Sequence, residues 1–359
     1  MKKLKVGVVF GGRSGEHEVS LVSAASVIKA LSPEKYEVAE IGITFGGEWL
    51  TGQNCLESFR SGRLENLESI SLPTNNPLPF ADIIFPVLHG PYGEDGTIQG
   101  LLEMLKIPYV GCGVLASSTA MDKLQSKAIF FAAGLPVCPY LGFTRVEWEK
   151  EPEKILKRIN DELGISCFIK PANMGSSVGI SKVKNPGELK PAIDLAAKFD
   201  RRILAEKAIN AREIECAVLG NDDPIAAPLG EIIVGGEFYD FNDKYVNGVS
   251  RAEIPAKLDS VTAVKIQKIS IEAYKALDCS GLARVDSFVD RDSGEIFINE
   301  INTMPGFTSI SMYPKMMLEN GISYEELVDR LIGFGMERFK DKQKNQIKFD
   351  SGSEWFRKI

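Results

Sequence analysis

Two strand-like segments, residues 284–290 and 296–301, carry the side chains with the clearest chemical potential. A glycine-containing loop at 291–295 predicts a β-hairpin, in which Phe288 faces Ile298, Asp286 faces Glu300 and Arg284 faces Asn302, all on one side of the sheet. Two opposed carboxylates repel, and a bound cation would remove that cost. Oxygen donors without a neighbouring histidine or thiolate favour Mg²⁺. The alternative is a surface hairpin whose charges merely alternate.

A second candidate site follows Lys170, which ends a predicted strand and precedes the loop Gly175-Ser176-Ser177-Val178-Gly179. The segment differs from a P-loop, because the lysine precedes the glycines and a strand follows them. Its layout is closer to a glycine-rich hairpin over phosphates, where backbone N–H groups and a lysine contact the oxygens. A flexible turn without a ligand is the alternative.

Two further segments carry weaker signals. The connection 205–213 could present backbone groups to an adenine and a carboxylate to ribose hydroxyls, although a plain charged turn explains it as well. The loop at 11–18 lacks the glycine spacing of a dinucleotide-binding turn, and its Glu16 suits an ammonium group. His17 and His89 are the only histidines, which disfavours a histidine-based metal site. A serine-hydrolase elbow is absent from the sequence.

The elements that must position these residues begin with an α/β pattern. Apolar runs predict strands at 4–10, 36–43 and 83–88, and helices at 19–31 and from about residue 97, whereas 46–80 is expected to be an irregular insertion. Alternating strands and helices predict a parallel sheet with ligands at the carboxyl ends of its strands. The polar loops 11–18 and 89–96 lie at such ends.

The pattern changes to α+β after about residue 120. We expect a helix at 122–133, then paired strands (167–170 with 180–183, 203–207 with 213–219, 284–290 with 296–301), with helices at 187–198 and 261–277 between them. A capping box, Ser323 with Glu326, begins a final amphipathic helix before a lysine-rich tail. The predicted domains are 1–120, 121–215 and 216–359.

Composition narrows the function classes. The 359 residues carry a net charge of −7, so the basic footprint of a nucleic-acid or anionic-membrane binder is missing. No apolar run approaches a membrane span, and the apolar start is short enough to be a strand rather than a signal peptide. Six scattered cysteines fit buried, reduced thiols. We therefore expect a cytoplasmic protein.

Together these segments resemble the D-alanine–D-alanine ligases of the ATP-grasp superfamily, along almost the whole chain and in the family's order. The motifs that carry the resemblance are Gly11–Ser20, His89–Gly96, Met121-Asp122-Lys123, Lys170-Pro171 with Gly175–Gly179, Lys244-Tyr245, Arg284-Val285-Asp286 and Asn299–Gly306. The resemblance implies an N-terminal α/β domain followed by two α+β lobes that hold ATP between them.

The resemblance also implies a reaction. ATP phosphorylates the carboxylate of one D-alanine, the amine of a second D-alanine attacks the acyl phosphate, and phosphate leaves a tetrahedral intermediate. Two Mg²⁺ ions, for which Mn²⁺ can substitute, would be bound by Asp286, Glu300 and Asn302. The nucleotide would be held by Lys123, Lys170, Ser176, Glu206, Lys207, Glu213 and Lys244.

Substrate roles follow in the same way. Glu16, in a network with Ser176 and Tyr245, would anchor the first ammonium group, and His89 would lie near that substrate. Arg284 and the Gly306 N–H would form the oxyanion site. Ser311 and the backbone of Met312 would hold the second carboxylate. The polar segment 237–253, with Lys244 and Tyr245, is the expected lid over the acyl phosphate.

Alternatives remain at this stage. Vancomycin-resistance relatives join D-alanine to D-serine or D-lactate; Tyr245 and Met312 resemble the dipeptide-forming enzymes instead, and resistance ligases tend to carry arginine where Met312 stands. Other carboxylate–amine substrate pairs, a non-catalytic ATP-binding module and a nicotinamide dehydrogenase are the remaining hypotheses. The family resemblance implies a homodimer and a role in peptidoglycan precursor synthesis.

Overall fold

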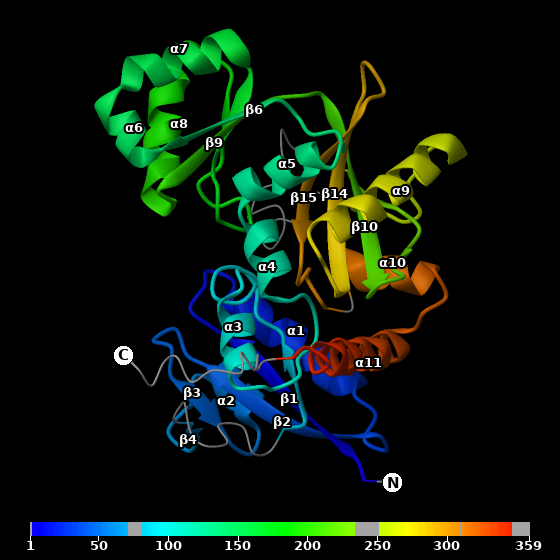
Figure 1. Ribbon diagram of the computed structural model, residues 1–359. Coiled ribbons are helices and arrows are strands. Elements are labelled where there is room, and N and C mark those ends of the chain that lie inside the picture. Colours follow the sequence, from blue (N-terminus) through cyan, green and yellow to red (C-terminus); the bar gives the residue numbers. More distant parts are fainter. Residues whose placement is uncertain (1, 71–80, 234–250, 309, 347–359) are drawn as a thin grey trace, which may run out of the picture.

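The computed structural model describes residues 2–70, 81–233, 251–308 and 310–346. Three sheets organise them, and Figure 1 shows the N-terminal sheet at the bottom, the lobe with α6–α8 at the upper left and the sheet with β10, β14 and β15 at the upper right. Within these residues, no helix has the combination of length and apolar character that crossing a membrane requires.

The N-terminal sheet has the order β4-β3-β2-β1-β5. Its strands are β1 (Leu4–Gly11), β2 (Tyr36–Ile43), β3 (Trp49–Thr51), β4 (Glu68–Ser69) and β5 (Ile83–Pro86), and its helices are α1 (His17–Ala30), α2 (Cys55–Ser61) and α3 (Thr97–Met104). β1 pairs in parallel with β2 and β5, which confirms the predicted parallel core. β3 and β4 add antiparallel strands at one edge.

The expectation of an irregular insertion at 46–80 is wrong for its described part, 46–70. Two short strands and α2 lie there, and α2 buries Cys55, Leu56 and Phe59 against the sheet. These elements have two to seven residues, so no window is long enough for a periodic pattern to appear. Residues 71–80 lie outside the described residues.

Two helices, α4 (Val114–Met121) and α5 (Lys123–Ala132), lead from the N-terminal sheet to the second lobe. α5 begins where predicted because Asp122 caps it, accepting hydrogen bonds from the N–H groups of Leu124 and Gln125. Lys123 and Lys127 are four residues apart and therefore share one face of this helix.

The second sheet has the order β6-β9-β7-β8. It consists of β6 (Tyr140–Thr144), β7 (Cys167–Pro171), β8 (Ser181–Val183) and β9 (Arg202–Lys207), with helices α6 (Arg145–Lys150), α7 (Pro152–Glu162) and α8 (Pro186–Phe199). The predicted pairing of 167–170 with 180–183 is confirmed, one residue shorter, as β7 with β8.

The third sheet has the order β13-β12-β10-β14-β15, with β11 paired to β10. Its strands are β10 (Ala211–Gly220), β11 (Ile225–Ala226), β12 (Gly230–Ile233), β13 (Arg251–Glu253), β14 (Gly281–Asp290) and β15 (Ile296–Asn302), and the helices are α9 (Ser260–Ala276), α10 (Met312–Glu319) and α11 (Tyr324–Lys342). At α11, Ser323 Oγ accepts from the Glu326 N–H, which is one half of the predicted capping box, whereas the Glu326 carboxylate accepts from Arg330.

The predicted pairing of 203–207 with 213–219 is wrong. β9 pairs with β6 and β7, whereas β10 pairs with β12 and β14 in the other sheet. Residues 208–210 carry the chain from one sheet to the other. A short polar connection between two apolar runs is compatible with a hairpin or with such a crossing, so the sequence alone did not distinguish them.

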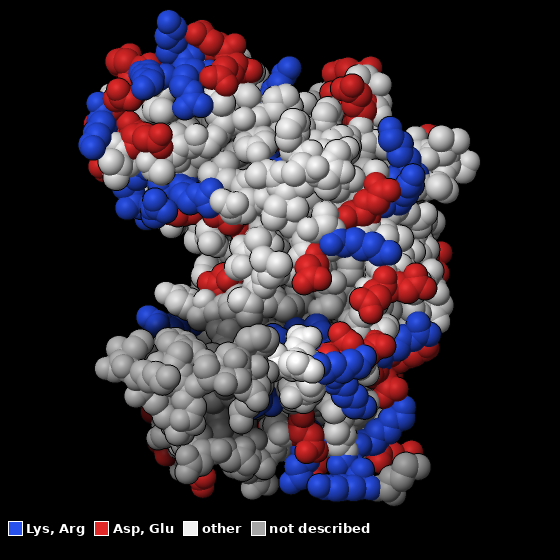
Figure 2. Space-filling model, in the orientation of Figure 1, with Lys and Arg blue, Asp and Glu red and all other residues white. Residues whose placement is uncertain are grey.

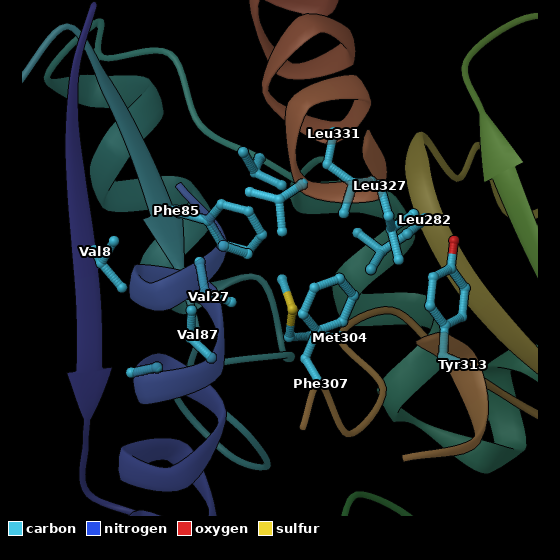
Figure 3. Packing of buried hydrophobic residues seen from close by; sticks show 14 of the residues in the cluster. Val8, Val27, Phe85, Val87, Leu282, Met304, Phe307, Tyr313, Leu327 and Leu331 are labelled. Carbon is cyan, nitrogen blue, oxygen red and sulfur yellow. The ribbon is translucent and has the colours of Figure 1, made fainter. Parts of the chain in front are cut away.

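One hydrophobic core joins the first and last parts of the chain. The N-terminal sheet and its helices α1–α3 are called the N-terminal layer below. Figure 3 shows Val8, Val27 and Phe85 of this layer facing Phe307, Leu327 and Leu331, and all of these side chains are buried. The second lobe has a separate core built from side chains of its own strands and helices. The N-terminal layer and α11 therefore form one packed unit.

We expect Leu331→Ala to lower the free energy of unfolding by about 2–5 kcal/mol, because Leu331 is fully buried where α11 meets the N-terminal layer. Leu318→Ala is the matched control, since Leu318 is 63% exposed. This variant should change the free energy of unfolding by no more than about 0.5 kcal/mol. Urea denaturation of both variants measures the difference. Equal values for the two variants would show that α11 does not stabilise the N-terminal layer.

Candidate functional site

An open cleft of about 1410 Å³ lies where the three sheets meet. Its walls include Glu16 from the N-terminal layer, Ser176 and Glu206 from the second lobe, and Arg284 and Glu300 from the third sheet. Figure 2 shows a hollow below the lobe of α6–α8, and acidic and basic side chains are mixed on the surface of that lobe. The predicted site residues that the structure describes are therefore gathered from all three parts of the chain.

The hairpin of β14 and β15 confirms two of the three predicted pairs. Arg284 pairs with Asn302 and Asp286 with Glu300, but Phe288 pairs with Phe297 rather than with Ile298. The register shifts between Asp286 and Ser287, which leaves Asn299 as an extra residue, a β-bulge. Ile298 consequently points into the core and is fully buried.

The bulge determines which face Glu300 occupies. Ile296 and Ile298 both point into the core, so strict alternation would bury Glu300 with them. The extra residue reverses the alternation, and Glu300 and Asn302 lie on the cleft side with Asp286. The prediction that these three residues share a face is correct, although the alternation assumed for it is wrong at Ile298.

The charges of this hairpin are balanced by protein cations. Arg284 donates from Nε and Nη2 to the two Asp286 oxygens, at 2.7 Å each, and Asn302 Nδ2 donates to Asp286 Oδ2 at 2.9 Å. Lys123 Nζ lies 3.0 Å from Glu300 Oε2. Burial would lower the pKa of Arg284, but Asp286 and Glu215 raise it well above its ordinary value. The sequence argument assumed that repulsion between these carboxylates requires a bound cation. Because protein cations already balance them, the repulsion alone does not require one.

The donor types still fit a hard cation. Two carboxylates and one amide oxygen on neighbouring strands offer oxygen ligands only, the set that Mg²⁺ prefers when phosphate oxygens and water complete it. In the described part of the chain, no three His, Cys, Asp or Glu side chains gather as an all-protein metal cage. Ligands from a bound phosphate would therefore be needed to complete a site here.

A buried ionic cluster connects α5, β7 and β9. Lys170 Nζ lies 2.6 Å from Glu206 Oε2, and Lys127 Nζ lies 2.5 Å from Glu206 Oε1. Burial would raise the pKa of Glu206, but the two ammonium groups outweigh it and lower the pKa to about 2. The pKa of Lys170 is raised, since Glu206 outweighs the lowering effect of burial. Sequence analysis missed Lys127, and its position one helical turn after Lys123 was the available signal.

The loop after β7 approaches the N-terminal layer. Ser176 and Ser177 have left-handed backbone conformations, with φ of 51° and 59°, and Lys123 Nζ donates to the Met174 carbonyl at 2.9 Å. Ser176 Oγ donates a hydrogen bond to Glu16 Oε1. The predicted contact between Glu16 and Ser176 is thus present, whereas Lys244 and Tyr245 lie outside the described residues.

The Glu16 carboxylate lies between two glycines. A Cβ at Gly90 would be 2.7 Å from Glu16 Oε2, and a Cβ at Gly175 would be 3.0 Å from the same oxygen. Gly90 also has a φ of +74°, a backbone conformation that residues other than glycine rarely adopt. These glycines allow the two backbone segments to approach the carboxylate closely, where any larger residue would clash with it.

His89 is buried beside this carboxylate and is neutral. Its Nδ1 lies 3.0 Å from the Met304 carbonyl oxygen, which can only accept, so Nδ1 carries the proton and Nε2 accepts from Ser23 Oγ at 3.0 Å. Burial lowers the pKa of His89 and outweighs the raising effect of Glu16. His89 lines the cleft, so it contributes shape rather than charge.

Glu94 is a cleft residue that sequence analysis missed, although it lies in the quoted segment His89–Gly96. Its carboxylate accepts from the backbone N–H of Gly90 at 3.1 Å and of Met304 at 3.2 Å. Burial, followed by the nearby Glu16 charge, raises the pKa of Glu94 well above its ordinary value. Glu94 thereby ties the loop after β5 to the loop after β15.

The remaining predicted residues also line the cleft. Lys207 and Glu213 flank the crossing 208–210, and Gly306, Ser311 and Met312 come from the loop after β15 and the start of α10. Ser311 is the N-cap of α10, and its Oγ accepts from the Thr308 N–H at 3.1 Å. A helix N-terminus favours an anionic ligand.

Two family models together match most of the chain. The model described as "D-ala D-ala ligase N-terminus" matches residues 5–112, and "D-ala D-ala ligase C-terminus" matches residues 129–333. The chain belongs to the D-alanine–D-alanine ligase family. Members are ATP-dependent ligases, so the family and the enzyme class that the sequence motifs indicated are confirmed.

Similar proteins span nearly the whole chain. A D-alanine–D-alanine ligase of Natranaerobius thermophilus is 51% identical over 97% of this chain and 99% of its own, and one of Acetivibrio thermocellus is 47% identical over 95% and 98%. Among solved structures, the D-alanine–D-alanine ligase of Coxiella burnetii has a TM-score of 0.85 at 34% identity, covering 96% and 97%. The VanG D-Ala:D-Ser ligase of Enterococcus faecalis has a TM-score of 0.84 at 39% identity, covering 93% and 100%. These neighbours confirm the predicted ATP-grasp fold.

The buried cluster predicts acid sensitivity. The folded-state pKa of Glu206 is about 2, below its ordinary 4.5, so its ion pairs stabilise the fold above pH 4.5 and this stabilisation is lost as the pH falls towards 2. The loss amounts to about 3 kcal/mol as an order of magnitude. In Glu206→Gln this contribution is absent, so the difference in unfolding free energy between wild type and variant should shrink across that range.

Urea denaturation at several pH values between 2 and 6 measures this difference. Glu149→Gln, at an exposed position, is the control and should stay parallel to wild type. A constant difference between wild type and Glu206→Gln would contradict the assignment of an ionised Glu206.

Proposed function

We propose that this chain joins two D-alanine molecules to D-alanyl-D-alanine at the expense of ATP, for peptidoglycan precursor synthesis. The observation that carries the proposal is the cleft itself. It holds a carboxylate suited to an ammonium group, Glu16, opposite oxygen donors and lysines suited to a metal-bound triphosphate. Family membership supplies the reaction class.

The nucleotide end of the cleft is assigned to the second lobe and its crossing to the third sheet. Lys123 and Lys170 hold phosphates, with the loop at Ser176 supplying backbone N–H groups, and Lys244 joins them. Glu206, Lys207 and Glu213 hold the adenosine. Asp286, Glu300 and Asn302 would hold two Mg²⁺ ions, or Mn²⁺. When bound, ATP with Mg²⁺ supplies the phosphoryl group that activates a carboxylate.

The substrate end is assigned to the N-terminal layer and to α10. Glu16, with Ser176 and Tyr245, binds the ammonium group of the first D-alanine, and neutral His89 shapes the space around it. Ser311 and the Met312 N–H bind the carboxylate of the second D-alanine at the start of α10. Its amine can then reach the activated carboxyl carbon of the first.

Arg284 and the Gly306 N–H stabilise the negative charge that develops on the oxygen of that carbon. Asp286 accepts the Nε hydrogen and one Nη2 hydrogen of Arg284, and we assign the Nη1 hydrogens to the developing oxyanion. Such preorganised donors are among the larger contributions to catalysis, typically about 3–4 kcal/mol each. The fixed fork on Asp286 keeps the guanidinium in place without substrate.

A D-alanine–D-serine ligase is the second candidate, because the VanG D-Ala:D-Ser ligase is 39% identical to this chain. Met312 argues against a lactate-forming or serine-forming enzyme, since resistance ligases tend to carry arginine there. A non-catalytic ATP-binding module would have no need for Arg284 in addition to the metal donors. A homodimer, a cytoplasmic location and the domains 1–120, 121–215 and 216–359 remain predictions; residue 215 lies within β10.

The first test is ADP release from ATP and Mg²⁺ with added D-alanine, followed by product identification. We expect D-alanine-dependent release with formation of the dipeptide, and none with L-alanine. D-serine and D-lactate are offered as second substrates in competition. ATP binding without D-alanine-dependent release would refute the ligase proposal, and a mixed product richer in D-serine would favour the second candidate.

A second test addresses the metal donors. Glu300→Gln should lower turnover by about 10²-fold or more while the melting temperature stays near that of wild type, because one anionic ligand is lost. Glu295→Gln, at an exposed position in the same hairpin, is the control and should retain full activity. Near-normal turnover of Glu300→Gln at ordinary Mg²⁺ concentrations would remove Glu300 from the metal site.

A further inference from the structure

The buried cluster of Lys127, Lys170 and Glu206 contains one more cation than its carboxylate needs. The three side chains are 1%, 9% and 2% exposed respectively, and each ammonium group contacts a different oxygen of Glu206. Lys170 and Glu206 line the cleft, whereas Lys127 is not among the residues that line it. Lys170 can therefore contact a ligand in the cleft, whereas Lys127 can act only through its neighbours.

Lys127 has a second, immobile acceptor. Its Nζ donates to the Asn299 carbonyl at 3.2 Å, and Asn299 is the bulge residue of β15. The adjacent Ile298 N–H donates to the Pro136 carbonyl at 2.8 Å, which fixes the strand next to the end of α5. Lys127 is thus held between the third sheet and Glu206; both of its partners line the cleft, although Lys127 itself does not.

We propose that Lys127 is a positioning residue that frees Lys170 to bind a nucleotide phosphate. This inference rests on the proposed function, in which Lys170 contacts ATP. When Lys170 turns from Glu206 towards a phosphate, the buried carboxylate must keep a cation, because an uncompensated buried charge is strongly unfavourable. Lys127 supplies that cation. Without Lys127, the only partner of Glu206 in this cluster is Lys170, which is then retained on the carboxylate.

This arrangement separates two parts of nucleotide affinity. Removing Lys127 leaves Glu206 paired with Lys170 and therefore in place, so the contribution of adenosine should persist. The contribution of the phosphates should fall, because Lys170 no longer reaches them at low cost. The ratio of the dissociation constants for adenosine and ADP therefore reports the function of Lys127.

The experiment is calorimetric titration of the full-length protein with adenosine and with ADP, without metal. In Lys127→Met we expect adenosine affinity within about threefold of wild type and ADP affinity at least about tenfold weaker. Lys127→Arg, which keeps the charge, should recover part of the ADP affinity. Equal weakening for adenosine and ADP would indicate a merely structural role and would overturn the proposal, as would unchanged ADP affinity.

A suppression test decides the case even if Lys127→Met folds poorly. In Glu206→Gln there is no carboxylate to retain Lys170, so the adenosine-to-ADP ratio in the double variant Lys127→Met/Glu206→Gln should match that of Glu206→Gln within about threefold. A further loss of ADP affinity in the double variant would contradict the proposal. Failure of the wild-type protein to bind ADP even after Mg²⁺ is added would instead contradict the proposed function, so the two failures are distinguishable.

Discussion

The β-bulge at Asn299 is the constraint on which the candidate active site depends. One extra residue in β15 turns Glu300 and Asn302 from the core to the cleft, where they meet Asp286 and Arg284. The displaced Asn299 carbonyl does not remain without a partner, because a buried lysine donates to it. The same local distortion thus places the proposed metal donors and anchors the ionic cluster of Lys127, Lys170 and Glu206. Deleting the extra residue of β15 would therefore turn Glu300 and Asn302 away from the cleft and remove the carbonyl that Lys127 contacts.

The three walls of the cleft differ in how they are held. The N-terminal layer and the third sheet share one core through α10 and α11, with Tyr313 donating to the Val218 carbonyl at 2.9 Å. The second lobe has its own core and meets α5 through a small apolar cluster of Leu124, Ala172 and Leu204. Side chains that line the cleft add ionic and polar contacts, among them Lys123 with Glu300 and Ser176 with Glu16, and a ligand can also contact these groups.

Sequence analysis succeeded where a pattern was long or a motif local. The strand 36–43 was predicted with the bounds that β2 has, and the pairs Arg284–Asn302 and Asp286–Glu300 were correct. It failed where two arrangements share one signature. A bulge leaves no mark in the sequence of β15, and the crossing at 208–210 resembles a hairpin turn. Short helices such as α2 fall below the length at which periodicity is visible.

The placement of α11 has a consequence for the order in which the chain can fold. Leu327 and Leu331 complete the core beneath β1 and α1, and Lys35 pairs with Asp329 across 294 residues of sequence. The strands of the N-terminal layer must therefore wait for a helix that is synthesised long after them, with part of their apolar surface uncovered. Contacts of such long sequence separation slow folding and lengthen exposure to aggregation. The nascent N-terminal layer is consequently the part of this enzyme that has most to gain from a chaperone.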